Sequence, residues 1–229
     1  SLALRRAPHD TPNPRPIVQQ GGTHDDFPAW SPTGSELAFE ATIPAQSSVR
    51  QVYRRNVTGG TPVRVAPSSA AQSSPDWSPR GDWIAFLEDS AGALKHDLKV
   101  AHTVTGEIRL LVGHGLRQGA PAFSPNGQKI AFAHQARVSE TQAPGVGWQI
   151  RSVDPDGSNN TPLVVLPNLG EPMSLRWNPN GSHIYFTRND SVFAIPGEGG
   201  QPVLCAGCGG SVASLDFRPS SGILALEEH

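Results

Sequence analysis

The stretch Pro28-Ala-Trp-Ser-Pro-Thr-Gly-Ser-Glu-Leu-Ala-Phe39 decides the fold, because the chain repeats it. Further copies, which weaken toward the end, cover residues 75–86, 121–132, 175–186 and 215–226. The aromatic third residue of each copy, from Trp30 to Phe217, recurs at intervals of about 47, 46, 54 and 40 residues, which is the spacing of propeller blades. The sequence therefore predicts a β-propeller with one blade per repeat.

Each copy places a Ser-Pro-x-Gly turn, or a near variant, between two apolar runs. Proline fixes φ for the second position of a type I turn, and glycine adopts the positive φ that closes a hairpin. The second run, as in Ile84-Ala-Phe86, is apolar at consecutive positions, which predicts a strand buried on both faces. We expect the motif aromatics Trp30, Trp77 and Trp177 to lie in the core between blades.

A second hairpin follows each of the first four copies, so that each repeat supplies four strands. The fifth copy stops after its first hairpin, whereas residues 1–20 resemble a second hairpin. We therefore predict a single all-β domain over residues 1–229, a five-bladed propeller of four-stranded blades. Its last blade would be closed by the N-terminal and C-terminal hairpins, from about 1–20 plus about 211–229, which would leave no blade edge unpaired.

The composition excludes several classes of protein. A chain of 229 residues with 24 Gly, 22 Pro and 37% hydrophobic residues is typical of a turn-rich globular domain. The formal net charge of −2 gives no reason to expect nucleic acid as a partner, and no apolar run is long enough to insert into a membrane. We expect a monomer without a cofactor or metal.

The repeated Trp-Ser-Pro-x-Gly-x-x-Ile-Ala-Phe unit, followed by a hairpin around Asp-Gly or Gly-Gly, resembles the repeat of TolB-like β-propellers, which are also described as WD-repeat-like. The resemblance covers essentially the whole chain. Many members carry Asp between the Pro and Gly of the turn, where this chain has other residues, so no role of that carboxylate is carried over: Thr33, Arg80, Asn126, Asn180 and Ser220.

This resemblance implies a bacterial, extracytoplasmic location, periplasmic or extracellular, as part of a larger and sometimes membrane-anchored protein. It also implies a non-catalytic role: a binding module, scaffold or sensor that recognises a protein segment or a small polar ligand. The alternatives are a propeller hydrolase of the glycosidase type, or the propeller that gates a peptidase whose catalytic domain is absent from these residues.

Candidate site residues come from the loops that enter the innermost strands, because ligands of propellers bind at a mouth of the central channel. Alignment of the repeats collects His24, Asp25, Arg117 and Glu171 at one rim, as a ring of mixed charge suited to a peptide or a small polar ligand. Solvated rim loops are also polar in any propeller, which is the simpler interpretation.

Two further sequence patterns bear on possible chemistry. Cys205-Ala-Gly-Cys208 lacks the second pair of ligands that a structural zinc site needs, so a disulfide within a loop is the favoured interpretation. Besides the rim acids Asp25, Asp26 and Glu171, a hydrolase could use Asp76 and Asp216, which precede motif aromatics on innermost strands. Because Asp76 and Asp216 belong to blades that are not adjacent, we predict no catalytic residue here.

Overall fold

The computed structural model describes residues 5–6, 15–16, 26–43, 46–90, 95–113, 117–136, 147–167, 170–207, 212–217 and 224–228. In this part of the chain, four antiparallel sheets of four strands each follow one another along the sequence. Blades 1 and 2 comprise β3 (Asp26–Trp30), β4 (Glu36–Ala41), β5 (Gln51–Asn56), β6 (Val63–Arg64), β7 (Gln72–Trp77), β8 (Trp83–Asp89), β9 (His96–His102) and β10 (Ile108–Val112). Blades 3 and 4 comprise β11 (Gln118–Phe123), β12 (Ile130–Ala136), β13 (Gly147–Val153), β14 (Thr161–Pro167), β15 (Met173–Trp177), β16 (His183–Arg188), β17 (Ser191–Pro196) and β18 (Val203–Gly207).

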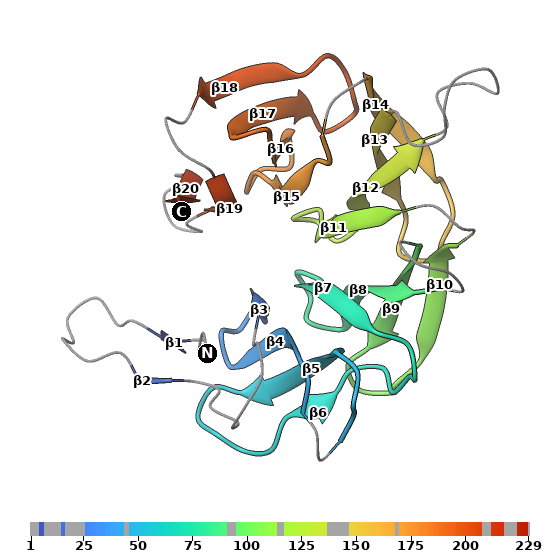
Figure 1. Cartoon of the computed structure of the whole chain (residues 1–229), viewed down its shortest axis with the longest axis vertical. Coiled ribbons are helices and arrows are strands. Elements are labelled where there is room, and N and C mark those ends of the chain that lie inside the picture. Colours follow the sequence, from blue (N-terminus) through green and yellow to red (C-terminus); the bar gives the residue numbers. More distant parts are fainter. Residues whose placement is uncertain are drawn as a thin grey trace.

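The blades are arranged around a centre with their first strands innermost (Figure 1). Successive inner strands contact one another, β3 with β7, β7 with β11 and β11 with β15. The prediction of an all-β propeller is therefore confirmed, with one blade for each of the first four repeats.

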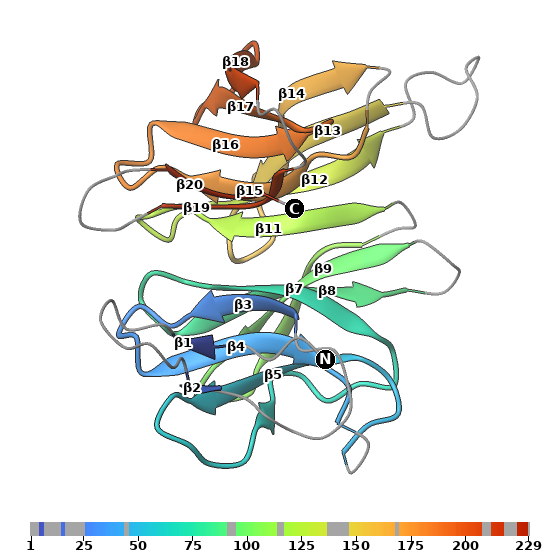
Figure 2. The same cartoon turned by 60° about the vertical axis from the view of Figure 1, so that its left-hand side comes forward.

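The prediction of five blades is wrong. The strands β1 (Arg5–Arg6) and β2 (Arg15–Pro16) pair only with each other, as do β19 (Val212–Phe217) and β20 (Leu224–Glu228). The two terminal hairpins thus form separate two-stranded sheets, with β1–β2 beside blade 1 and β19–β20 beside blade 4 (Figure 2). A physical reason lies in β1 and β2, which offer three arginines and a proline where a blade needs an apolar row, and proline cannot donate to a ladder.

The hairpin turns are built as expected and carry one further hydrogen bond. The turn glycines of the four blades are Gly34, Gly81, Gly127 and Gly181. Each has a φ between +67° and +78°, and its N–H donates to the backbone carbonyl of the residue before the turn proline. The side chain of that preceding residue accepts the N–H of the residue five positions later, over 2.9 Å at Ser31, 3.0 Å at Ser78, 2.9 Å at Ser124 and 3.0 Å at Asn178. A side-chain oxygen at this position thus closes each turn.

Turns of neighbouring blades pack on one another. A Cβ atom at Gly81 would lie 3.6 Å from Pro32 Cδ, one at Gly127 would lie 3.2 Å from Pro79 Cγ, and one at Gly181 would lie 3.7 Å from Pro125 Cδ. Each proline ring therefore rests on the glycine of the next turn, which has no side chain to hold it off. At Gly34, in contrast, no described atom lies within 4 Å of that position.

Two hydrogen bonds join the inner strands across blades. The N–H of Phe123 donates to Asp76 Oδ2 over 2.7 Å, and Trp177 Nε1 donates to the carbonyl of Ala122 over 3.1 Å. Next to the inner strands, the apolar rows of the second strands are buried on both faces, as predicted. At most 1% of the surface is exposed in each of these residues of blades 1 to 3: Leu37, Ala38, Phe39, Ile84, Ala85, Phe86, Ile130, Ala131 and Phe132.

One core prediction is wrong. Trp77 and Trp177 are 7% and 8% exposed, whereas Trp30 is 45% exposed. Each motif aromatic is covered by the blade before it, as Trp177 is by the strand that holds Ala122. Blade 1 has no four-stranded blade before it among the described residues, so Trp30 keeps an open face.

Trp177→Ala should destabilise the fold much more than Trp30→Ala. Truncating a buried tryptophan costs about 3–5 kcal/mol of unfolding free energy, and Trp177 also loses its bond to Ala122. For the half-exposed Trp30 we expect about 1–2 kcal/mol, because less apolar area returns to water. Urea unfolding of the two variants measures the difference, and equal losses would show that Trp30 is covered in solution.

Gly127→Ala and Gly34→Ala separate turn packing from backbone strain. Both residues have positive φ, so both variants lose about 1 kcal/mol from the left-handed conformation. Gly127→Ala should lose about 1 kcal/mol more, since its methyl group meets the Pro79 ring while that of Gly34→Ala points into open space. Thermal unfolding of the pair gives the comparison, and identical losses would contradict the turn-packing argument.

Candidate functional site

Arg117 and Glu171 meet at the rim formed by the loops that enter the inner strands. Arg117 directly precedes β11, and Glu171 lies two residues before β15, so the two residues come from adjacent blades. Arg117 Nη2 lies 2.9 Å from Glu171 Oε2, with the two side chains 35% and 29% exposed. The N–H of Gln135 donates to the Arg117 carbonyl over 2.9 Å and fixes the backbone there.

Neighbouring groups shape this ion pair. The Arg117 guanidinium lies 5.9 Å from the centre of the Trp148 ring, which supports it by a cation–π contact. A Cβ atom at Gly119 would lie 3.2 Å from Glu171 Oε1, so the carboxylate approaches β11 closely because this residue is glycine. Burial raises the pKa of Glu171, and the positive charges of Arg117 and His96 oppose that rise only in part.

His96 and Asp89 extend the cluster into blade 2. They face one another at the junction of β8 and β9, where they form a pair in the strand register. His96 Nδ1 lies 2.9 Å from the carbonyl of Gln118, which makes Nδ1 the donor, and His96 Nε2 lies 3.6 Å from Asp89 Oδ1. The imidazole therefore links blade 2 to the start of β11, beside Arg117.

We call Asp89, His96, Arg117 and Glu171 the rim cluster. It presents both signs of charge across three successive blades, and its central ion pair is about one-third exposed. An Arg–Glu pair of this kind can open toward a ligand that carries a carboxylate, an amide or an amine, since the arginine donates and the glutamate accepts. The charged groups of the rim cluster therefore suit the binding of a polar ligand.

The structure brings two of the predicted site residues together. Arg117 and Glu171 form the ion pair, while His24 and Asp25 lie outside the described residues. Cys205 is exposed in β18 and Cys208 lies outside the described residues, so their disulfide stays a prediction. Asp76, considered as a hydrolase acid, instead accepts the backbone N–H of Phe123; the side chain of Asp216 is not described.

Sequence reasoning missed His96, Asp89 and the role of Trp148. His96 and Asp89 lie between the second and third strands of a blade, not in a loop that enters an inner strand, so repeat alignment did not select them. Trp148 lies in β13, near its start. It is 5% exposed and packs in the core between blades 3 and 4.

The described residues hold neither a membrane-spanning helix nor a metal-binding cluster. No helix in this part of the chain is long and apolar enough to cross a membrane. Within the same residues, no three side chains of His, Cys, Asp or Glu come together as a metal site.

Known proteins show the same architecture. The chain is 34% identical over 113 residues to the Tol-Pal system protein TolB of Gluconobacter oxydans, covering 48% of this chain and 23% of that protein. It is 25% identical over 148 residues to an uncharacterized peptidase of Bacillus subtilis, covering 50% and 22% of the two chains. The chain spans about half or less of the length of the curated relatives that it matches.

Solved structures agree in fold. The crystal structure of TolB from Acinetobacter baumannii superposes with a TM-score of 0.64 at 17% identity, covering 82% of this chain and 44% of that one. An oligogalacturonate lyase in complex with manganese superposes with a TM-score of 0.66 at 13% identity, covering 91% and 63%. At these identities the likeness shows the fold alone.

The family model described as the TolB beta propeller domain matches residues 11–165, which is more than half of the chain. The chain belongs to the TolB β-propeller family.

Proposed function

We propose that this propeller is a non-catalytic binding module that holds a segment of a partner protein at its rim, through Arg117 and Glu171. The observation that carries the proposal is their ion pair of 2.9 Å, which joins two blades and still leaves both side chains accessible. A buried structural pair would be closed to a ligand, whereas this one can exchange partners at low cost. His24 and Asp25 complete the proposed rim as predictions from the repeat alignment.

The family supports this role and a location outside the cytoplasm. A TolB relative is named as a protein of the Tol-Pal system, which is an assembly of proteins. We propose by analogy a protein partner and an extracytoplasmic location, periplasmic or extracellular, with this propeller as one part of a larger protein.

A hydrolase or a peptidase-gating propeller is the alternative function. Its support is a peptidase relative, of which this chain covers 22%. Among the acids considered for catalysis, Asp76 is engaged by the backbone of the next blade, which favours a structural role for it. Binding at the rim cluster needs no such acid.

The double variant Arg117→Ala/Glu171→Ala should abolish recognition while leaving the fold intact. Peptides selected from a random 12-residue phage-display library on the wild-type protein serve as probes. We expect them to bind the double variant at least about tenfold more weakly, which corresponds to about 1.4 kcal/mol, because the charge-assisted hydrogen bonds are lost. Isothermal titration calorimetry measures the affinities.

The matched control is Arg54→Ala/Glu36→Ala. This pair has a similar distance, 3.3 Å, and similar exposure, 29% and 31%, but lies at the opposite end of blade 1. Peptide affinity should be unchanged in the control. Selected peptides that bind the rim variant as tightly as the wild type, or a library that yields none, would refute the rim assignment.

The raised pKa of Glu171 allows a test without a ligand. A carboxyl group whose folded pKa lies above its unfolded value holds its proton more tightly in the folded state, so it stabilises the fold below the unfolded pKa and this contribution is lost as pH rises through the folded pKa. The wild type should therefore lose stability relative to Glu171→Gln as pH rises above about 4.5. Urea unfolding at several pH values measures this, and the opposite slope would show that the attraction to Arg117 outweighs burial.

A further inference from the structure

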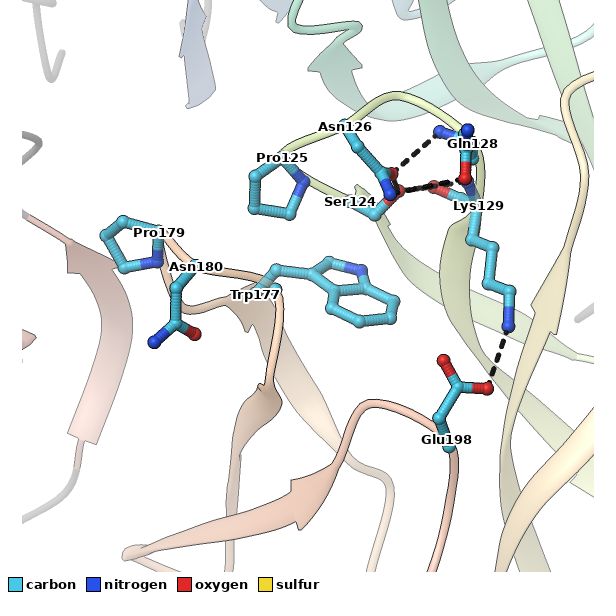
Figure 3. Close-up of a pocket in the computed structure, with 10 residues that line it drawn as sticks. Ser124, Pro125, Asn126, Gln128, Lys129, Trp177, Pro179, Asn180 and Glu198 are labelled. Atoms are coloured by element: carbon cyan, nitrogen blue, oxygen red, sulfur yellow. Dashed lines mark hydrogen bonds and ion pairs between the residues drawn. The ribbon is translucent and has the colours of Figure 1, made fainter.

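Two cavities lie at the other end of the blades, on the face that carries the Ser-Pro-x-Gly turns. The first, of about 340 Å³, lies between the turns of blades 3 and 4 (Figure 3). Asn126 and Asn180 line it from the two turns, and Trp177 lines it from β15. Lys129 and Glu198 close one side, with Nζ and Oε2 3.2 Å apart across the two blades (Figure 3).

The second cavity, of about 640 Å³, adjoins the first. Gln128 and Lys129 line both cavities, so the two spaces are adjacent. The second cavity runs across the end of blade 3 to Arg109 on β10, and Asn159 and Thr161 line it from blade 3. We call the two cavities together the turn groove. It is elongated, and it extends from blade 2 to blade 4.

The charges of the turn groove are compensated within the protein. Its lining holds two cations, Lys129 and Arg109, and three carboxylates, those of Asp154, Asp156 and Glu198. Lys129 pairs with Glu198, and Arg109 pairs with Glu107 over 2.6 Å. An anionic ligand would meet a small excess of negative charge, so the groove disfavours anionic ligands.

The amides of the groove are oriented by the turns. Asn126 Oδ1 accepts the N–H of Gln128 over 3.0 Å, and Asn180 Oδ1 accepts the N–H of Ser182 over 2.9 Å. With each oxygen held in its turn, the Nδ2 groups are the remaining donors, and that of Asn126 also donates one hydrogen to Gln128 Oε1 over 3.3 Å, which leaves it one N–H for a ligand. Both asparagines occupy the turn position between proline and glycine, so two adjacent blades present amide donors at equivalent places.

Trp177 lines the first cavity between these amides and, at 8% exposed, offers a ligand only a small apolar surface. Its Nε1 is engaged by the carbonyl of Ala122, so the indole offers a ligand carbon contacts rather than a hydrogen bond. The rings of Pro125 and Pro179 flank it (Figure 3). A ligand must therefore combine apolar faces with groups that both donate and accept hydrogen bonds.

We propose that the turn groove binds a neutral polyhydroxylated ligand, namely a segment of an oligosaccharide chain. Sugar hydroxyls accept from the asparagine amides and donate to Glu198 and Asp156, while the C–H faces of the rings lie against Trp177 and the prolines. This site is at the opposite end of the blades from the rim cluster and does not rest on its function.

The test uses maltotriose, cellotriose and triacetylchitotriose as probes. Chemical shifts of the tryptophan indole N–H groups in proton–nitrogen NMR spectra report binding, and the resonance of Trp177 should move while that of Trp30, on blade 1, stays. We expect at least one trisaccharide to bind, and Asn126→Ala/Asn180→Ala to weaken it by about tenfold or more through the loss of two hydrogen bonds.

The control is Thr33→Ala/Arg80→Ala, which changes the same turn position in blades 1 and 2, outside the groove, and should leave affinity unchanged. Arg117→Ala/Glu171→Ala should also leave it unchanged, which separates this site from the rim. If the asparagine variant melts well below the wild type, Gln128→Ala, which lines both cavities, replaces it. No binding by any trisaccharide, an equal loss in the control, or a loss in the rim variant would overturn the proposal.

Discussion

The contact between a proline ring and the glycine of the next turn sets the distance between blades. The ring of Pro79 lies so close to Gly127 that a methyl group there would sit 3.2 Å from it. Each glycine must also adopt positive φ to close its own hairpin, so one residue satisfies a local and an inter-blade constraint together. Once the turns are stacked, the inner strands lie close enough for hydrogen bonds between blades. Asp76 of blade 2 accepts a backbone N–H of blade 3, and Trp177 of blade 4 donates to a backbone carbonyl of blade 3.

Features that follow from this repeat could be predicted from the sequence. The turn glycines, the buried second strands and the four strands of each blade all depend on residues within one repeat, so spacing and residue type were sufficient. The fifth blade could not be predicted in this way, because it required pairing between the two distant ends of the described chain. The hairpin of β1 and β2 has the right place along the chain, but Pro16 has no backbone N–H to donate to a blade. The predicted burial of Trp30 is wrong for a related reason. The motif predicts a buried tryptophan, but its burial depends on the blade before it.

The candidate site shows the same division. Arg117 and Glu171 could be brought together because both precede inner strands, and equivalent loops of a repeat meet at one rim. His96 reaches the carbonyl of Gln118 from a different junction of the preceding blade. The register between β8 and β9 and the reach of the imidazole decide that contact, and neither can be read from residue spacing. The raised pKa of Glu171 likewise depends on burial between blades.

Each inner strand separates two ends that are under different constraints. At the turn end, the serine or asparagine, the proline and the glycine are all engaged in closing and stacking the hairpins, whereas the residue between proline and glycine differs from blade to blade. At the rim end, blades 2 and 3 repeat one contact, in which Gln72 and Gln118 each donate to a carbonyl six residues earlier, while the residues that precede these glutamines differ. A ring of equal blades can therefore acquire distinct sites at both ends without altering its packing. In this chain, Asn126 and Asn180 at one end and Arg117 and Glu171 at the other are substitutions of this kind, placed at the same junction between blades 3 and 4.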